Sequence, residues 1–143
     1  MDNASDSELA CEAQATILVV DDTPENLLLM SRLLNTNYKV KVANGGETAL
    51  RIAQSDTPPD LILLDIMMPD MDGYEVCRRL QNGAQTRDIP VIFLSAKSDA
   101  ADEAKGLELG AVDYITKPIS LPVVLAKIHT YLDMIKSSEF PER

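Results

Sequence analysis

The sequence is poor in cysteine, aromatic residues and positive charge. Its 143 residues include two cysteines and no tryptophan, and only 4% are aromatic. Cys11 and Cys77 are too few for a disulfide framework, so both are expected to be free thiols in a reducing compartment. Lysine and arginine total 13 against 23 acidic residues, which gives a formal net charge of −10. Because phosphate backbones select basic surfaces, this balance argues against direct contact with nucleic acid.

Long apolar runs are also missing. No stretch approaches the roughly 20 apolar residues of a membrane-spanning helix, so no membrane partner is expected. The first residues, MDNASDSELACEAQA, are acidic where a secretory signal would be basic, which predicts a cytoplasmic location. The length suits one domain. We expect a disordered lead-in at 1–14, the domain at 15–137 and a tail at 138–143.

What the sequence does contain is a regular alternation of short apolar runs and helical patterns. The runs at 17–20, 61–64 and 91–94 lack polar alternation, as expected of strands buried on both faces. Residues 38–42 alternate with lysine, which predicts an edge strand, and 112–115 is a short fifth strand. Five strands alternating with five helices predict a doubly wound α/β fold, (βα)5, with a parallel sheet between two helix layers. The edge strand favours the order 2-1-3-4-5.

Capping signals mark where several helices begin and end. Thr23 precedes Pro24 and is expected to cap the first helix. Asp72 and Glu75 have the spacing of a capping box at the start of the third helix. Gly110 is expected to end the fourth helix.

Reactive side chains stand where the predicted strands end. They are Asp21 and Asp22 after the first strand, Asp65 after the third, Ser95 after the fourth and Lys117 after the fifth. In a doubly wound sheet the carboxyl ends of neighbouring strands open onto one crevice. Three close carboxylates repel one another and favour a cation, and oxygen ligands without histidine or cysteine suit Mg²⁺. Taken alone, Asp21 and Asp22 are explained equally well as a strand end and a helix cap.

The same residues suit phosphoryl transfer to a carboxylate. Asp65 beside a bound cation can attack a phosphoryl group and form an acyl phosphate. The Lys117 ammonium can neutralise charge on the phosphoryl oxygens, and the Ser95 hydroxyl can donate to another of them. A cis bond between Lys117 and Pro118 would aim the lysine over the crevice, although trans is the commoner form. Each residue alone has a plain structural explanation, and their joint placement favours the functional one.

Four segments together resemble a known family. ILVVDD, LILLDIMMPDMDGYE, VIFLSA and DYITKP are similar to the signature of bacterial response-regulator receiver domains, the CheY-like superfamily. The resemblance covers about residues 16–136, and five separated positions agree in identity and spacing. It implies a flavodoxin-like three-layer sandwich with Asp65 as the phosphoacceptor. It also implies a histidine kinase or a histidine phosphotransfer protein as the phosphoryl donor.

The resemblance assigns roles to the other residues of the crevice. Asp22 and Asp65 would bind Mg²⁺ directly, together with the main-chain carbonyl of Met67. Asp21 would act mostly through water, and Lys117 would pair with the phosphoryl group.

The resemblance also implies a switch. The Ser95 hydroxyl would move toward the phosphoryl group and the Tyr114 ring would turn inward. The affected face would be the one that family members commonly use for dimers or targets, formed by residues 98–109, 112–115 and 120–136. A phosphorylation-dependent homodimer through this face is therefore expected. No second domain pattern follows residue 136, which predicts a single-domain regulator or an excised receiver.

Two other functions compete with the switch. A Mg²⁺-dependent phosphohydrolase with an aspartyl nucleophile, of the haloacid-dehalogenase type, needs Asp-x-Asp after its first strand and usually a cap insertion. This chain has Asp21-Asp22-Thr23 and no spare length, so no enzymatic turnover is expected beyond its own phosphorylation and dephosphorylation. A degenerate receiver that serves only as a binding surface is disfavoured because no reactive residue is missing.

Overall fold

Strands and helices alternate along the whole described chain. The computed structural model describes residues 15–95, 100–117 and 119–139, with the side chains at 100–103 and 135–139 excepted. The elements are β1 (Thr16–Val20), α2 (Pro24–Leu34), β2 (Lys39–Ala43), α3 (Gly46–Ala53), β3 (Leu61–Asp65), α4 (Gly73–Asn82), β4 (Val91–Ser95), α5 (Ala100–Glu108), β5 (Asp113–Thr116) and α6 (Leu121–Glu139). The predicted (βα)5 alternation is confirmed.

Some predicted features lie outside the described residues. They are the lead-in at 1–14, which includes Cys11, Pro118 of the predicted cis bond, and residues 140–143 of the predicted tail. The last helix, α6, continues beyond its expected end at 136, as far as Glu139. The limits of the domain stay a prediction.

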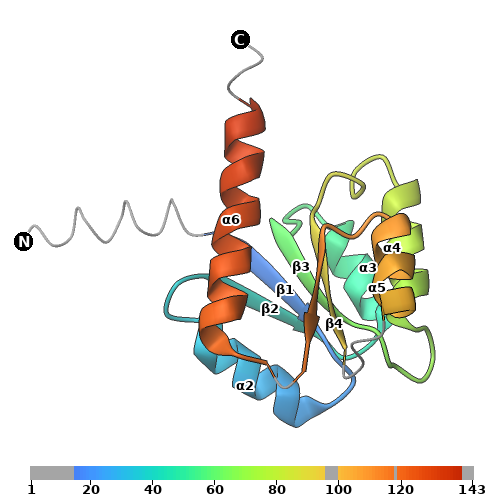
Figure 1. Cartoon of the computed structure of the whole chain (residues 1–143), viewed down its shortest axis with the longest axis horizontal. Coiled ribbons are helices and arrows are strands. Elements are labelled where there is room, and N and C mark those ends of the chain that lie inside the picture. The colour runs from blue at the N-terminus through green and yellow to red at the C-terminus, as the bar shows by residue number, and fades with distance from the viewer. Residues whose placement is uncertain (1–14, 96–99, 118, 140–143) are drawn as a thin grey trace, which may run out of the picture.

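The five strands form one parallel sheet. Their order is β2-β1-β3-β4-β5, as predicted. Figure 1 shows the sheet at the centre of the molecule, with helices on both sides. The edge position of β2 is confirmed, because Val42 is 43% exposed whereas every residue of β3 and β4 is buried. The register sets Val20 opposite Leu64, and Asp65 opposite Leu94, so the carboxyl ends of β1, β3 and β4 lie side by side.

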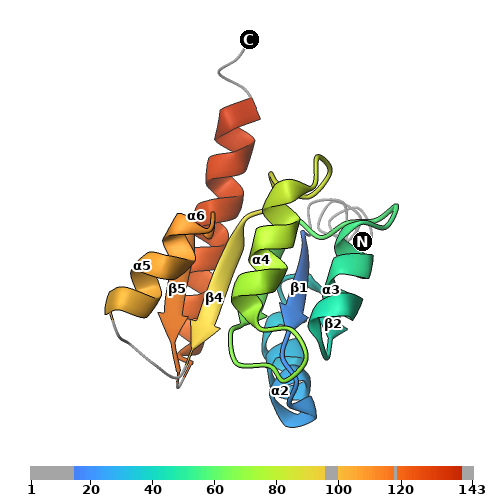
Figure 2. The same cartoon turned by 90° about the vertical axis from the view of Figure 1, so that its right-hand side faces the viewer.

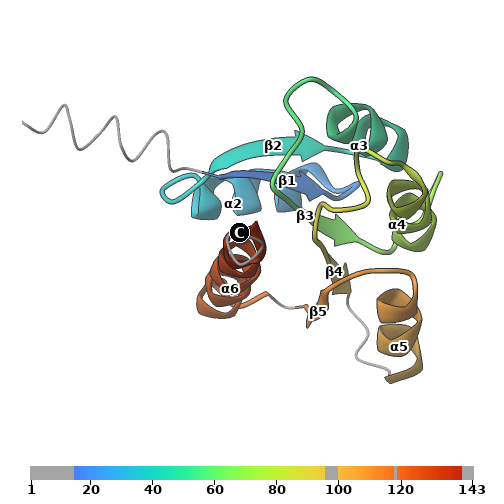
Figure 3. The ribbon, with the colours of Figure 1, turned by 90° about the horizontal axis from the view of Figure 1, so that it is seen from above.

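Two helix layers cover the sheet. Figure 3 shows α2 and α6 on one side and α3, α4 and α5 on the other, and Figure 2 looks onto the second layer. Alternate residues of β1 point to opposite layers: Leu18 and Val20 belong to the core on the α3 and α4 side, and Ile17 and Val19 to the core around α2 and α6. All four are fully buried, and each such side chain stabilises the fold by about 1.5–3 kcal/mol. The predicted three-layer sandwich is confirmed.

The start of α4 has half of the predicted capping box. The Asp72 carboxylate accepts a hydrogen bond from the main-chain N–H of Glu75 over 3.0 Å. The Glu75 carboxylate accepts bonds from Arg78 over 3.1 Å and from Arg79 over 2.8 Å. The two guanidinium groups hold the pKa of Glu75 at about 2, well below its usual range. Glu75 thus stabilises its own helix surface through neighbours one turn further on.

The ends of two other helices are fixed by main-chain bonds. Thr23 precedes Pro24 at the start of α2 as predicted, but its side chain makes no capping bond. After α5, Gly110 has a φ of +110°, which favours glycine. The N–H of Gly110 donates to Leu107 over 3.1 Å, and that of Ala111 to Gly106 over 3.2 Å. This is the Schellman pattern, so the predicted end of the helix at Gly110 is confirmed.

Candidate functional site

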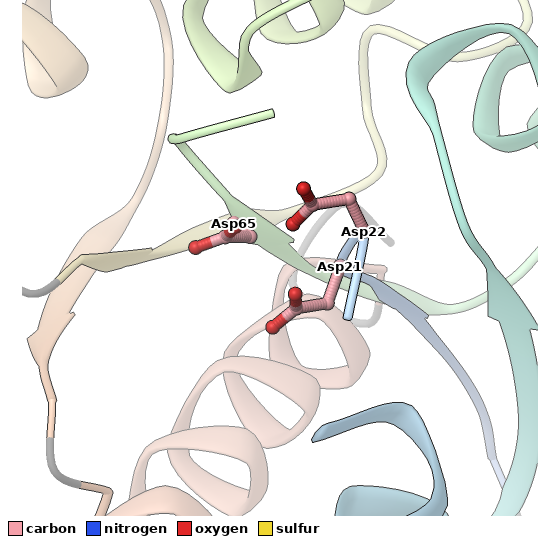
Figure 4. Close-up of side chains that lie close together, drawn as sticks. All are labelled: Asp21, Asp22 and Asp65. Carbon is pink, nitrogen blue, oxygen red and sulfur yellow. The ribbon is translucent and has the colours of Figure 1, made fainter. Parts of the chain in front are cut away.

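Four of the predicted site residues meet at the carboxyl edge of the sheet. Asp21 and Asp22 follow β1, Asp65 ends β3 and Lys117 follows β5. Figure 4 shows the carboxylates of Asp21, Asp22 and Asp65 close together above the strand ends. Each aspartate offers one oxygen to a set in which all atoms lie within 4.8 Å of one another. The grouping follows from the sheet order, because β1 and β3 are neighbours although their sequences are far apart.

Asp65 is a buried carboxyl group at the centre of this set. Its residue surface is 4% exposed. Burial raises its pKa above the ordinary value, and the charges of Asp21 and Asp22 act in the same direction. The hydrogen bond and the charge of Lys117 oppose this shift without cancelling it. The ionised form of Asp65 is therefore held against a net cost, which a bound cation would relieve.

Lys117 forms ion pairs with two of the site carboxylates. Its Nζ lies 3.0 Å from Oδ1 of Asp65 and 3.5 Å from Oδ2 of Asp21. Its main-chain N–H donates to the carbonyl of Ser95 over 2.7 Å, which extends the pairing of β5 with β4. Burial lowers the pKa of Lys117, but the bond and the charge of Asp65 outweigh burial and raise the pKa above its usual value. The side chain is therefore an ammonium group at neutral pH.

Asp21 is held by donors on both of its oxygens. Its Oδ1 accepts the main-chain N–H of Thr23 over 3.0 Å, and its Oδ2 accepts the amide Nδ2 of Asn26 over 3.1 Å. Asn26 was not predicted as part of the site. The sequence does contain a sign of its role. Asn26 precedes Met30 by four residues and Leu34 by eight, so its polar amide lies on the same face of α2 as these buried side chains.

The carboxylate set fits a magnesium ion. It consists of oxygen ligands alone, two of them on buried residues and one on the exposed Asp22. Mg²⁺ binds through a few carboxylates and keeps several waters, which an exposed rim allows. Met67 follows Asp65 by two positions in the loop before α4, and the residue is 61% exposed. The part of its carbonyl in metal binding stays a prediction.

The two predicted switch residues lie on β4 and β5. Ser95 is 3% exposed and directly follows Leu94, the residue opposite Asp65 in the sheet. Tyr114 lies opposite Phe93 and is 7% exposed, as part of the core on the α3 and α4 side. Both side chains are thus buried on neighbouring strands, with Ser95 at the crevice end of β4 and Tyr114 two pairs further from that end on β5. Their roles as a switch stay a prediction.

A glycine outside the predicted site supports the main chain at Asp65. The N–H of Gly73 donates to the carbonyl of Ile66 over 2.9 Å. A Cβ at this position would lie 2.5 Å from the carbonyl oxygen of Asp65 and 2.8 Å from Cα of Ile66. Only glycine lets the start of α4 approach the end of β3 this closely. The loop between them is therefore closed tightly around Asp65.

The sequence matches one protein family over most of its length, the response regulator receiver domain, at residues 17–129. The chain is 47% identical over 127 residues to a probable cyclic di-GMP phosphodiesterase of Vibrio cholerae serotype O1. It is 46% identical over 117 residues to the response regulator PleD of Caulobacter vibrioides. These alignments cover 89% and 81% of this chain but only 29% and 26% of the two relatives. The chain thus spans less than a third of either relative.

A solved structure has the same fold. The BeF3-activated DrrB receiver domain is 34% identical to this chain and superposes with a TM-score of 0.75. The match covers 84% of this chain and 98% of that one.

Proposed function

This chain belongs to the response regulator receiver domains of two-component systems, and we propose that Asp65 is the residue in it that accepts the phosphoryl group. Receiver domains act by phosphorylation of an aspartate, and their donors are histidine kinases or phosphotransfer proteins. The proposal rests on the groups that surround Asp65. Its buried carboxylate is bonded to Lys117 over 3.0 Å and shares a possible cation site with Asp21 and Asp22.

In the proposed reaction a carboxylate oxygen of Asp65 forms a bond to phosphorus. The bond between phosphorus and nitrogen of the donor's phosphohistidine breaks, and the imidazole keeps the electron pair and takes up a proton. Asp22, Asp65 and the Met67 carbonyl would hold the magnesium ion, with Asp21 acting mostly through water. When bound, the ion supplies positive charge for the phosphoryl oxygens. Lys117, whose Nζ lies 3.0 Å from Asp65, would supply a second positive charge.

The product changes the charge beside two buried switch residues. A phosphoryl group brings about −1.5 to −2 charges and three strong acceptors at neutral pH. We propose that the Ser95 hydroxyl donates to one of these oxygens, and that Tyr114 on the next strand moves with it. This would reshape the face formed by α5, β5 and α6, through which we propose that phosphorylated copies dimerise. The support is position, since Ser95 follows the residue that pairs with Asp65.

An exposed apolar pair lies on α2, the helix that starts near the crevice. Leu28 and Leu29 are each 55% exposed on α2, the helix that begins just after Asp21 and Asp22. Exposed apolar side chains that gather on one helix offer a surface for a protein contact. We propose that this pair meets the histidine kinase or phosphotransfer protein while its phosphohistidine reaches Asp65.

Four further properties accompany this function. None of the helices in the described ranges combines the length and hydropathy that a bilayer crossing requires. We propose the cytoplasm as the compartment, because phosphohistidine donors are made there from ATP. We also propose that the chain does not contact nucleic acid directly, in keeping with its net charge of −10. Receiver domains generally have no enzymatic activity toward other molecules, and we propose that the chemistry of this chain ends at its own aspartate.

Intact mass measurement tests the assignment. The protein is incubated with Mg²⁺ and a small acyl phosphate, and its mass is compared with that of Asp65→Asn. We expect one phosphoryl adduct on the wild type and none on the variant. Asp133→Asn is the matched control, since Asp133 is exposed on α6, and it should keep the adduct. An adduct that survives in Asp65→Asn overturns the assignment, and steady turnover of unrelated phosphomonoesters would favour the hydrolase instead.

A further inference from the structure

A residue of α2 that takes no part in the reaction itself fixes one of the site carboxylates. Asn26 lies in the first turn of α2, and its amide Nδ2 donates to Oδ2 of Asp21 over 3.1 Å. The main-chain N–H of Thr23 donates to Oδ1 of the same carboxylate over 3.0 Å. Both oxygens of Asp21 are therefore held from the start of one helix. The carboxylate cannot rotate without losing at least one of these bonds.

Asn26 and Lys117 share a single oxygen. The Lys117 Nζ lies 3.5 Å from Oδ2 of Asp21 but 3.0 Å from Oδ1 of Asp65. Asn26 is thus the closer donor to Oδ2 of Asp21, and the lysine stands nearer to Asp65, where phosphoryl charge would develop. If the amide were removed, Oδ2 would rely more on the ammonium, since charge-assisted bonds are the strong ones. Lys117 would then be drawn toward Asp21 and away from the reacting carboxylate.

The Asn26 amide bonds to a buried carboxylate, unlike an amide on the protein surface. Asp21 is 3% exposed, so bulk water has little access to replace a lost donor. Asn26 is half-buried and shares a stripe of α2 with Met30 and Leu34, both of which are buried. Packing and helix propensity alone would favour an aliphatic side chain at this position. The amide is explained by its bond to Asp21.

We propose that Asn26 is a positioning residue for the magnesium site: it holds Asp21 in the orientation that receives the ion's water and leaves Lys117 for Asp65. This inference rests on the proposed function of the site. Groups that orient metal ligands in this way change metal affinity strongly, so we expect Mg²⁺ to bind about tenfold more weakly when the Asn26 amide is removed. The variants are Asn26→Ala and Asn26→Leu, of which the second keeps nearly the shape of asparagine without its donor.

Binding is measured first without any phosphoryl donor. Because the chain has no tryptophan, Mg²⁺ affinity is read from the rise of the unfolding midpoint with Mg²⁺ concentration, followed by circular dichroism. Asn82→Ala is the matched control, since Asn82 is exposed at the end of α4 remote from the crevice. We expect both Asn26 variants to need about tenfold more Mg²⁺ for the same shift, and Asn82→Ala to follow the wild type.

The rate of phosphorylation then separates positioning from a loss of structure. The rate of adduct formation from a small acyl phosphate is measured as Mg²⁺ is varied. In the Asn26 variants the Mg²⁺ concentration for the half-maximal rate should rise about tenfold. The rate at saturating Mg²⁺ should also fall, because Lys117 is drawn toward Asp21 and away from Asp65. A purely structural role would lower the metal-free stability and leave the half-maximal concentration unchanged.

The outcomes distinguish this inference from the function on which it rests. An unchanged Mg²⁺ requirement in both Asn26 variants, with normal phosphorylation of Asp65, overturns the positioning role and leaves the proposed function standing. An equal loss in Asn82→Ala overturns the positioning role as well. A wild-type protein that shows neither a Mg²⁺-dependent midpoint nor an adduct overturns both.

Discussion

Replacing Asp65 with asparagine should stabilise the magnesium-free protein, although it removes the proposed reactive group. Asparagine has nearly the same shape as aspartate, so no cavity forms, and its oxygen can still accept a bond from Lys117. The substitution removes a buried negative charge that destabilises the folded state. The destabilisation is reflected in the raised pKa of Asp65, which is caused first by burial and then by the neighbouring carboxylates. The site is thus built for chemistry at the expense of stability.

The expected gain in the free energy of unfolding is the balance of three contributions: repulsion by Asp21, burial of the Asp65 charge, and attraction to Lys117. At 4.8 Å from an Asp21 oxygen, the outer limit of the set, the Asp65 charge is repelled by about 3.5 kcal/mol at an effective dielectric constant of about 20. Its burial costs several kcal/mol more. The Lys117 ammonium at 3.0 Å returns about 5.5 kcal/mol on the same scale. Because these terms largely cancel, we expect a net gain on the order of 1 kcal/mol, or about 4 °C in the midpoint of thermal unfolding.

The gain should depend on pH in a definite direction. A carboxyl group whose pKa is raised by folding binds its proton more tightly in the native state than in the unfolded state. Wild-type stability therefore falls as pH rises from the ordinary carboxyl pKa through the raised pKa of Asp65. Below that window Asp65 is neutral in both states and the advantage of Asp65→Asn vanishes, whereas above it the advantage is complete.

Urea unfolding followed by circular dichroism measures this prediction, with Asp133→Asn as the control for loss of an exposed carboxylate. The control should change stability by less than about 0.5 kcal/mol. Mg²⁺ at ten times its dissociation constant should stabilise the wild type by about 1.4 kcal/mol and the Asp65 variant by less. A metal-free variant that is less stable than the wild type at neutral pH, or a gain that does not shrink in acid, would refute the reasoning.

Three further predictions concern positions around the site. Gly73→Ala would set a Cβ 2.5 Å from the Asp65 carbonyl oxygen, so we expect a loss of about 2 kcal/mol in urea unfolding; an unchanged midpoint would contradict the close approach. Asp72→Ala removes the cap of α4 and should cost about 1 kcal/mol in the same assay, whereas Asp72→Asn should retain most of the stability. Burial raises the pKa of the Cys77 thiol to about 11, so in Cys11→Ser protein a thiol reagent should label Cys77 only on unfolding; rapid labelling of the native protein would contradict this.

The fold could be predicted because its signals are local and agree with one another. Uninterrupted apolar runs such as 61–64, bounded by turn signals, are typical of strands buried on both faces, and the lysines of β2 indicate an edge strand. The sheet order then follows, and it brings Asp21, Asp65 and Lys117 together without any further information. Strand ends alone therefore predict this cluster, whereas Met67 and Tyr114 follow only from the family resemblance.

What could not be predicted is which of several partners a polar side chain takes. The spacing of Asp72 and Glu75 predicts a capping box, in which the Glu75 carboxylate would accept the main-chain N–H of Asp72. In the structure the Glu75 carboxylate instead accepts charge-assisted bonds from Arg78 and Arg79, one turn further along the helix. Asn26 reaches Asp21 only because α2 begins directly after β1 and turns its first residues back over the strand end. Such choices depend on side-chain rotamers and on the angle between elements, which periodicity does not encode.

The central claim is that one particular aspartate carries the phosphoryl group, and direct mapping tests it most sharply. The protein is phosphorylated with Mg²⁺ and a small acyl phosphate and then reduced with borohydride, which converts an aspartyl phosphate into homoserine. Peptide mass spectrometry then reads which position has changed. We expect homoserine at Asp65 and unchanged aspartate at Asp21 and Asp22. Homoserine at either of those two positions, with Asp65 intact, would contradict it.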